Sequence, residues 1–154
     1  MPAEITDPDL IEQEADVTLA GFHLWILGRE FPRSKDYWDG NWILVKVVCK
    51  SQTSRTQAIG TFIHLPELSG WRKELKRLYR RVHGDAELKC MEPVLNAKVS
   101  LDKRGAGTFT VNITPDHMKE QHQYVFEIDQ SYLRSVISQL TSVLKKHSIR
   151  KRIF

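Results

Sequence analysis

The stretch "KDYWDGNWILVKVV", residues 35–48, sets two tryptophans and a tyrosine around an Asp-Gly-Asn turn and then runs into an apolar segment. Aspartate, glycine and asparagine favour tight turns because they tolerate positive φ or bond their own backbone. The segment that begins at Trp42 is rich in valine and isoleucine, which favour strands. The stretch therefore predicts a turn followed by a strand. It leaves open whether the aromatic loop is a binding site or a pinned structural element.

Outward from this stretch, alternating apolar and polar residues predict further strands. One strand is expected over residues 17–30, and residues 42–50 and 57–65 extend it into an antiparallel meander. Four more alternating runs follow at residues 86–92, 94–102, 107–114 and 123–129, separated by proline- and glycine-containing links. The sequence therefore predicts about seven strands in an antiparallel sheet.

Two segments have helical periodicity instead. Apolar residues recur at spacings of three and four over residues 65–84 and again over residues 129–147, which is typical of helices packed on a sheet. Pro66 suits the first turn of the first helix, Gly84 suits a left-handed residue that ends it, and Asp129 suits the N-cap of the second. The expected order is βββ-α-ββββ-α, an α+β fold in which two amphipathic helices pack on an antiparallel meander.

Length and composition favour a single domain, since about 100–200 residues per domain is usual and the chain has 154. Cys49 and Cys90 both lie in apolar runs, so buried free thiols and a reducing compartment are expected. No apolar run approaches the roughly 18 residues of a membrane span, and the acidic N-terminus lacks the layout of a signal peptide. A cytoplasmic protein is expected, and its oligomeric state stays open between monomer and dimer.

The charge is distributed unevenly along the chain. Residues 1–16 contain six acids and no bases, which leaves 23 Lys and Arg against 13 Asp and Glu in the rest, a net charge of +10. Residues 1–16 are expected to be a flexible acidic arm, residues 17–147 the α+β domain and residues 148–154 a basic tail. Basic residues also cover the outer face of the first helix, and they are the candidate partner-binding residues: Arg72, Lys73, Lys76, Arg77 and Arg80.

The sequence does not indicate an enzyme. It has no phosphate-binding or dinucleotide-binding glycine motif and no nucleophile elbow, and its six histidines are scattered without metal-ligand spacing. Asp36 and Asp39 flank the aromatic turn, but short acids in a turn more often bond their own backbone. No catalytic, cofactor-binding or metal-binding residues are therefore expected. The basic helix and tail keep a nucleic-acid-binding domain as the alternative function.

The stretch "GREFPRSKDYWDGNWILVKVV", residues 28–48, resembles the signature of the WapI-type immunity proteins of bacterial polymorphic toxin systems. In that family an early strand ends in G-x-E-F/Y-P, the loop reads D-Y-W-D-x-N-W, and a strand follows. The resemblance continues in "LPEL" at residues 65–68 and in "FEIDQSYLRSVISQL" at residues 126–140, and spans about residues 17 to 147. Ten residues match the signature: Gly28, Glu30, Phe31, Pro32, Asp36, Tyr37, Trp38, Asp39, Asn41 and Trp42.

The resemblance implies a small cytoplasmic α+β protein that binds and neutralises the toxic C-terminal domain of a cognate secreted toxin, without catalysis or a cofactor. Partners differ from one such system to the next, whereas the loop recurs. A structural role for the loop is therefore favoured over a partner-specific contact. Large aromatic side chains can fold over a sheet edge while the short polar side chains close the turn. The residues assigned to this structural loop are Asp36, Tyr37, Trp38, Asp39, Asn41 and Trp42.

Overall fold

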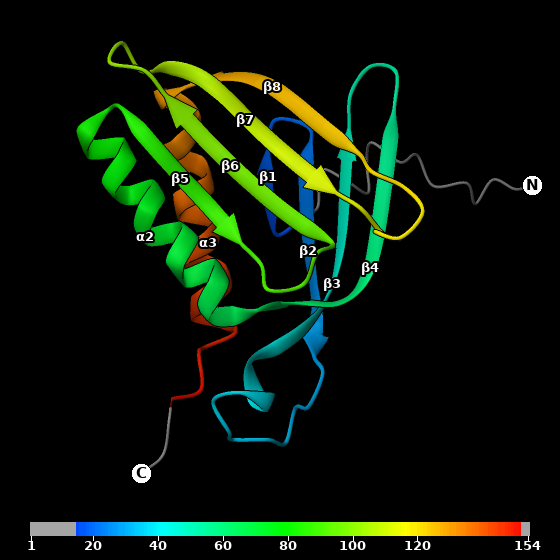
Figure 1. Cartoon of the computed structure of the whole chain (residues 1–154). Helices are drawn as coiled ribbons and strands as arrows, with labels where there is room; N and C mark the ends of the chain where they lie inside the picture. The colour runs from blue at the N-terminus through cyan, green and yellow to red at the C-terminus, as the bar shows by residue number, and fades with distance from the viewer. Residues whose placement is uncertain (1–14, 152–154) are drawn as a thin grey trace, which may run out of the picture.

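Two four-stranded antiparallel sheets and two helices make up residues 15–151, the part of the chain that the computed structural model describes (Figure 1). The first sheet has the order β1-β2-β3-β4 and the second the order β5-β6-β7-β8. The first sheet consists of β1 (Val17–Leu19), β2 (Phe22–Arg29), β3 (Trp42–Lys50) and β4 (Arg55–His64). The second consists of β5 (Gly84–Lys89), β6 (Leu95–Leu101), β7 (Ala106–Ile113) and β8 (Gln123–Asp129).

Each meander is followed by its helix. Helix α2 (Leu65–Arg81) follows β4, and α3 (Leu133–Lys146) follows β8 after a short 3₁₀ turn, η2 (Gln130–Tyr132). The α+β class and both helices are thus confirmed, but the expected single sheet of about seven strands is wrong. After α2 the chain does not return to the first sheet: β5 pairs with β6 and begins a second sheet. Figure 1 shows the two helices side by side, with the strands of the two sheets running in different directions.

The eighth strand comes from a hairpin inside residues 17–30. Leu19 pairs with Phe22, so Ala20 and Gly21 form a two-residue turn, in which Ala20 has a φ of 51°. Gly21 lies against the end of β3, and a Cβ there would be 2.0 Å from the carbonyl oxygen of Lys50. Alternation of apolar residues continues through this turn, and for that reason the sequence pattern did not separate β1 from β2.

The core sits where the two sheets meet α2. Phe22 of β2 makes edge-to-face contacts with Trp71 of α2 (ring centroids 6.2 Å apart) and with Phe109 of β7 (5.7 Å). All three side chains are fully buried. Aromatic pairs at these distances add about 0.5–1.5 kcal/mol each beyond burial. Elsewhere the Tyr124 hydroxyl of β8 bonds Thr56 Oγ1 of β4 at 2.8 Å and so joins the two sheets.

Helix α2 buries the stripe that its periodicity predicts, with Leu68, Trp71, Leu75 and Leu78 all inaccessible or nearly so. Its left-handed end residue is Val82 (φ 73°), whose N–H bonds the Leu78 carbonyl. The assignment of that role to Gly84 was therefore wrong, although Gly84 also has positive φ as it starts β5. Asp129, expected as the N-cap of the second helix, caps the preceding 3₁₀ turn η2 instead, because its carboxylate accepts the Ser131 N–H at 2.8 Å. The residue before α3 is Tyr132, which makes no side-chain cap bond.

The ends of the described chain are tied to the first sheet. The acidic arm expected at residues 1–16 lies outside the described residues as far as residue 14. Asp16 is described, and its carboxylate accepts the Ile26 N–H at 2.7 Å. Cys49 is buried in β3, whereas Cys90 lies one residue beyond β5 and is partly exposed. In residues 15–151 no helix combines the length and the hydropathy needed to cross a membrane.

Candidate functional site: the aromatic loop and the basic face of α2

The aromatic loop, residues 30–41, leaves β2 beside a break in strand pairing. Pairing between β2 and β3 shifts between Ile26 and Gly28, which is a β-bulge centred on Leu27. A bulge bends a strand and changes where the following side chains point. Beyond it the Arg29 guanidinium donates to the carbonyl oxygen of Gly40 at 2.6 Å. The bulge thus directs the last side chain of β2 into the loop.

Within the loop the Asp36 side chain bonds the backbone. The Asp39 N–H donates to Asp36 Oδ2 at 2.8 Å, and the Gly40 N–H donates to the Asp36 carbonyl oxygen at 2.8 Å. These bonds form the short 3₁₀ turn η1 (Asp39–Asn41) that feeds β3. Asp36 therefore serves the turn rather than facing Asp39 as a catalytic carboxylate pair.

Asn41 ties the loop to the C-terminal segment and is fully buried. Its Nδ2 donates to the carbonyl oxygens of Tyr37 (2.7 Å) and Arg150 (2.9 Å), and its Oδ1 accepts the Arg150 N–H at 2.8 Å. A buried amide with its donors and acceptor satisfied is strongly constrained in position. Asn41 therefore fixes both the turn and the segment that crosses it.

Arg150 holds the other side of the loop. Its guanidinium donates to the carbonyl oxygens of Phe31 (3.3 Å), Pro32 (2.7 Å) and Ser34. The Arg29 guanidinium also donates to the Ser148 carbonyl oxygen. Burial, and then the charge of Arg150 nearby, lower the pKa of Arg29. From the sequence, Arg150 was expected to lie in a basic tail accessible to anions. In the structure its guanidinium instead holds the loop through three backbone carbonyl groups.

Two aromatic residues of the loop and Trp42, the first residue of β3, gather around His64, the last residue of β4. The His64 ring centroid lies 4.7 Å from Trp42, 5.1 Å from Trp38 and 5.7 Å from Tyr37. His64 Nε2 lies 2.9 Å from the Trp38 carbonyl oxygen; because a carbonyl only accepts, Nε2 carries the proton. Three of the six residues named from the sequence are thus brought together around one histidine, for which the sequence pattern contained no signal.

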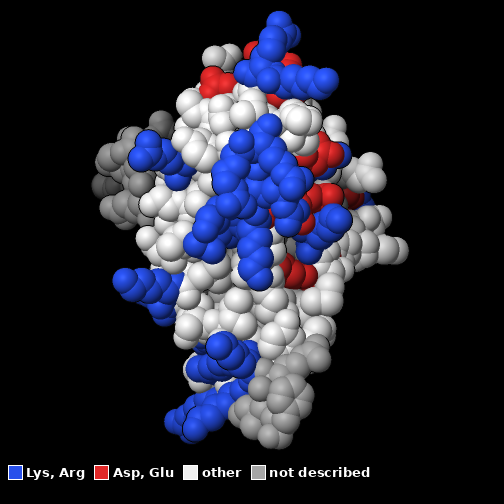
Figure 2. Space-filling model, turned by 90° about the vertical axis from the view of Figure 1, so that its left-hand side faces the viewer, with Lys and Arg blue, Asp and Glu red and all other residues white. Residues whose placement is uncertain are grey.

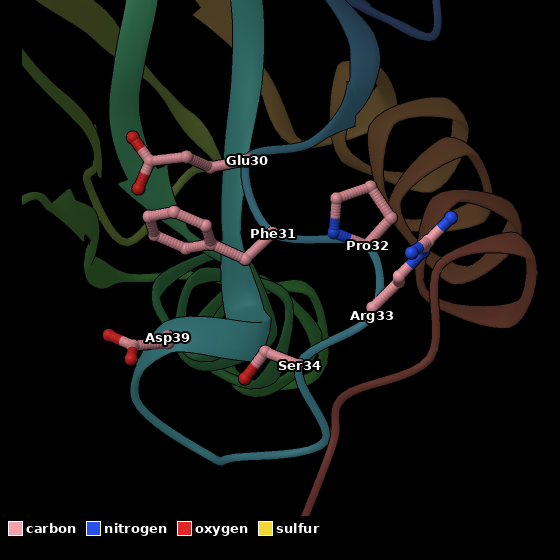
Figure 3. A pocket seen from close by; sticks show the side chains of 6 residues that line it. All are labelled: Glu30, Phe31, Pro32, Arg33, Ser34 and Asp39. Carbon is pink, nitrogen blue, oxygen red and sulfur yellow. The ribbon is translucent and has the colours of Figure 1, made fainter.

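Two aromatic rings of the loop remain half exposed: Phe31 at 48% and Trp38 at 50%. Phe31 belongs to an open notch of about 550 Å³. In Figure 3 the Glu30 carboxylate, the Phe31 ring and the Asp39 carboxylate point to the same side, and Arg33 points away from them. The loop is therefore pinned through its backbone while part of its aromatic surface stays accessible. The residues that line the notch are Glu30, Phe31, Pro32, Arg33, Ser34 and Asp39.

Near the start of α2, Glu67 accepts two backbone N–H groups, from His64 and from Met91, each at 2.8 Å. Burial raises the pKa of Glu67. Burial, then the neighbouring Glu67, also raises the pKa of the Cys90 thiol, so that it stays protonated. A protonated thiol is a poor nucleophile, and His64 Nε2 is committed to a carbonyl. This cysteine, histidine and glutamate therefore do not form a nucleophilic site.

The basic face of α2 lies apart from the loop. Figure 2 shows Lys and Arg side chains gathered over this helix, with acidic residues beside them. Both acids of α2 are bonded to backbone groups, because Glu74 accepts the Glu87 N–H at 2.9 Å and Glu67 binds as described above. Among residues 15–151, no carboxylate oxygen lies within 4.0 Å of a charged side-chain nitrogen of the six basic residues of α2: Arg72, Lys73, Lys76, Arg77, Arg80 and Arg81.

The remaining polar candidates do not assemble. His122 pairs with Glu120 at 2.9 Å in the link before β8, and His117 is exposed in the same link. Within the described chain, no three His, Cys, Asp or Glu side chains are arranged to hold a metal ion. Sequence reasoning missed Arg29, His64 and Arg150 as loop residues, since their roles depend on contacts between segments far apart in the chain.

Comparison with known proteins gives similar solved structures and one protein family. The solved structure of WHY3 from Arabidopsis thaliana has a TM-score of 0.44 at 10% sequence identity, over 69% of this chain and 67% of that chain. No curated protein sequence matches. The family model described as "Immunity protein WapI-like family" matches residues 15–148, which include both sheets, both helices and the whole aromatic loop. The chain therefore belongs to the WapI-like family of immunity proteins.

Proposed function

We propose that this protein binds the toxic C-terminal domain of a cognate secreted toxin in the cytoplasm of the producing cell. It neutralises that domain by stoichiometric occlusion of its active site or substrate path. Membership of the WapI-like immunity family supports the role. The observation that carries the proposal is the face of α2, where six cations have no carboxylate partner among residues 15–151.

An unpaired row of cations is costly for a helix on its own. Like charges at i and i+4 destabilise a helix by about 0.2–0.5 kcal/mol per pair, and Arg72, Lys76 and Arg80 form two such pairs. Near the helix C-terminus Arg80 and Arg81 gain from the helix dipole, but that gain does not extend to Arg72 or Lys73. A partner with negative potential would compensate this repulsion and accelerate encounter. The proposed contact residues are Arg72, Lys73, Lys76, Arg77 and Arg80.

The alternative is a nucleic-acid-associated binding domain, which the same cations favour. Binding of that kind would use the helix together with the C-terminal segment. Arg150 of that segment donates to three loop carbonyls instead. Residues engaged in this way are poorly placed to contact phosphates, so the immunity function is the better supported of the two.

We expect the gene immediately upstream to encode a large secreted protein with a variable C-terminal domain. The proposal is tested by expressing that domain with and without this chain. We expect growth arrest with the toxin domain alone, and rescue together with a 1:1 complex in light scattering when both are present. A toxin domain from an unrelated system serves as the specificity control. Rescue without a complex would contradict stoichiometric occlusion, and arrest despite stable expression of this chain would contradict the immunity function.

A further inference from the structure

A small hollow lies between α2 and α3, within the basic face. It has a volume of about 190 Å³ and is lined by Lys76, Tyr79 and Arg80 of α2 and by Arg134 and Ile137 of α3. Small-molecule sites usually occupy about 300–1,000 Å³. The hollow is therefore of a size for one side chain of a partner rather than for a complete small ligand.

The hollow combines an apolar base with a cationic rim. Tyr79 and Ile137 are partly buried and pack against the hydrophobic core. Lys76, Arg80 and Arg134 are exposed around them, and within residues 15–151 these three cations have no hydrogen bond or ion pair through their side chains. An apolar pocket surrounded by unpaired charges of one sign is suited to an apolar side chain flanked by opposite charges.

The walls of the hollow are held in place. Arg72, one turn before Lys76, donates through Nε to Thr141 Oγ1 of α3 at 2.8 Å. At the other end the Gln130 side chain donates to the Tyr79 carbonyl oxygen at 2.6 Å. Helix α2 is thus joined to α3 on one side of the hollow and to η2, the turn that leads into α3, on the other. A pre-organised pocket loses less entropy when it binds.

We infer that the hollow is the docking point for an acidic segment of a protein partner. One aliphatic or aromatic side chain of that segment enters between Tyr79 and Ile137, and flanking carboxylates pair with Arg80, Arg134 and Lys76. The inference rests on the proposed function and deepens it, since it states the chemistry of the toxin surface that the basic face receives. Guanidinium groups bind carboxylates in a two-point geometry, which gives direction as well as attraction.

A protein segment fits this surface better than a nucleic acid does. Strand-binding surfaces combine a cationic track with successive exposed rings on which bases stack. Here the hollow offers one ring, Tyr79, which is partly buried. Three cations surround a single apolar pocket, an arrangement that matches an anchored side chain with acidic neighbours.

Two lysines outside the basic face supply a matched control. Lys119 and Lys151 are exposed and do not line the hollow. The variant R80E/R134E and the variant K119E/K151E change the net charge by the same amount. A difference between them therefore reports position and not total charge.

The probes are two acetylated, amidated peptides with two glutamates on each side of a central leucine or a central serine, together with a ten-nucleotide oligothymidine. They are titrated into the full chain and followed by amide NMR shifts. We expect the leucine peptide to shift the signals of Tyr79, Arg80 and Ile137. We expect the serine peptide to bind at least about tenfold more weakly, as loss of a buried leucine side chain implies. R80E/R134E should weaken leucine-peptide binding by about tenfold and K119E/K151E by less than about threefold.

Equal losses in the two double variants, or equal binding of the two peptides, would overturn the inference. Tighter binding of the oligothymidine than of the leucine peptide would overturn it in favour of nucleic acid. Thermal melts of both variants establish that they fold, and Ile137→Ser tests the apolar base without a change of charge. If the R80E/R134E variant neutralises the toxin domain as well as the unmodified chain does, the docking point is refuted, but the proposed function still stands.

Discussion

The side-chain amide of Asn41 bonds both the N–H and the carbonyl oxygen of Arg150, at 2.8 and 2.9 Å. It thereby satisfies both backbone hydrogen-bonding groups of a residue 109 positions away in the sequence. The same amide also bonds the Tyr37 carbonyl oxygen. One fully buried side chain therefore joins the aromatic loop to the C-terminal segment.

Replacement of Asn41 should be costly. Asn41→Ala leaves the Arg150 N–H without its acceptor, and we expect the free energy of unfolding to fall by about 2–3 kcal/mol. Asn41→Asp keeps the acceptor but places a carboxylate oxygen against two carbonyl oxygens, so it should also destabilise. Urea unfolding measures both variants. Wild-type stability in Asn41→Asp would show that the two Nδ2 bonds contribute nothing.

Arg150→Ala should loosen the loop without unfolding the protein. The substitution removes the guanidinium bonds to the Phe31, Pro32 and Ser34 carbonyls but leaves Asn41 and His64 in place. Amide hydrogen exchange over residues 30–41 should become faster, while exchange in β6 and β7 stays unchanged. Lys151→Ala, which removes the neighbouring exposed cation, is the control. Equal exchange rates in the two variants would show that the Arg150 guanidinium does not hold the loop in place.

Two glycine substitutions should act in opposite directions. Gly21→Ala would put a Cβ 2.0 Å from the Lys50 carbonyl oxygen and 2.8 Å from the Phe126 ring, and should destabilise by about 2–3 kcal/mol. Gly70→Ala places its Cβ in open space on α2 and should stabilise by about 0.5–1 kcal/mol through helix propensity. Thermal melting measures both. A Gly21→Ala variant as stable as wild type would mean that the β1–β2 turn does not approach Lys50 so closely.

The buried thiol of Cys49 should make stability fall in alkali. Burial raises its pKa from the ordinary value of 9.0 to about 12. The folded chain therefore keeps the thiol proton between pH 9 and 12, whereas the unfolded chain loses it. Stability from this group is complete below pH 9 and declines above it by about 1 kcal/mol per pH unit. Urea unfolding at pH 8.5 and 10.5 should show a smaller decline in Cys49→Ala, and equal declines would place the thiol in contact with water.

Affinity for nucleic acid should be weak. At physiological salt we expect DNA or RNA to bind the wild-type chain no more tightly than about 10⁻⁴–10⁻⁶ M, the range of non-specific electrostatic contacts. The triple variant R72E/K76E/R80E should lose even this weak binding. Fluorescence anisotropy at two salt concentrations measures the affinity of both proteins for DNA and RNA. Submicromolar binding that disappears in the triple variant would favour the nucleic-acid function over the immunity function.

Sequence periodicity was sufficient where one element buries one face. The stripe of Leu68, Trp71, Leu75 and Leu78 on α2 and the strands around Val99 and Val111 were predictable, because burial repeats with the period of the element. Periodicity did not separate β1 from β2, since the alternation passes through Ala20 and Gly21. It also could not show that β5 leaves the first sheet, because strand pairing depends on where α2 places the chain.

The contacts of the aromatic loop likewise fall into two groups, those that the sequence could predict and those that it could not. Asp36, Asp39 and Gly40 carry local turn chemistry that is visible in the sequence. His64 and Arg150 contribute through contacts 26 and 116 positions from their loop partners, and single-sequence patterns contain no signal for such pairs. The hollow between α2 and α3 was missed for a related reason: Arg134 and Ile137 look like ordinary residues of an amphipathic helix until α2 is placed beside them.

The bonds between Asn41 and Arg150 also determine when, during synthesis of the chain, the aromatic loop can reach its final structure. During synthesis the chain emerges from its N-terminal end, so β2, the loop and β3 leave the ribosome long before Arg150 does. Until that segment is synthesised, the side-chain amide of Asn41 lacks its two bonds to the Arg150 backbone. The carbonyl groups of Phe31, Pro32 and Ser34 likewise lack the Arg150 guanidinium as their donor. The loop can therefore take its final shape only after both sheets and both helices have been synthesised, and a nascent chain does not present the finished aromatic surface to any partner.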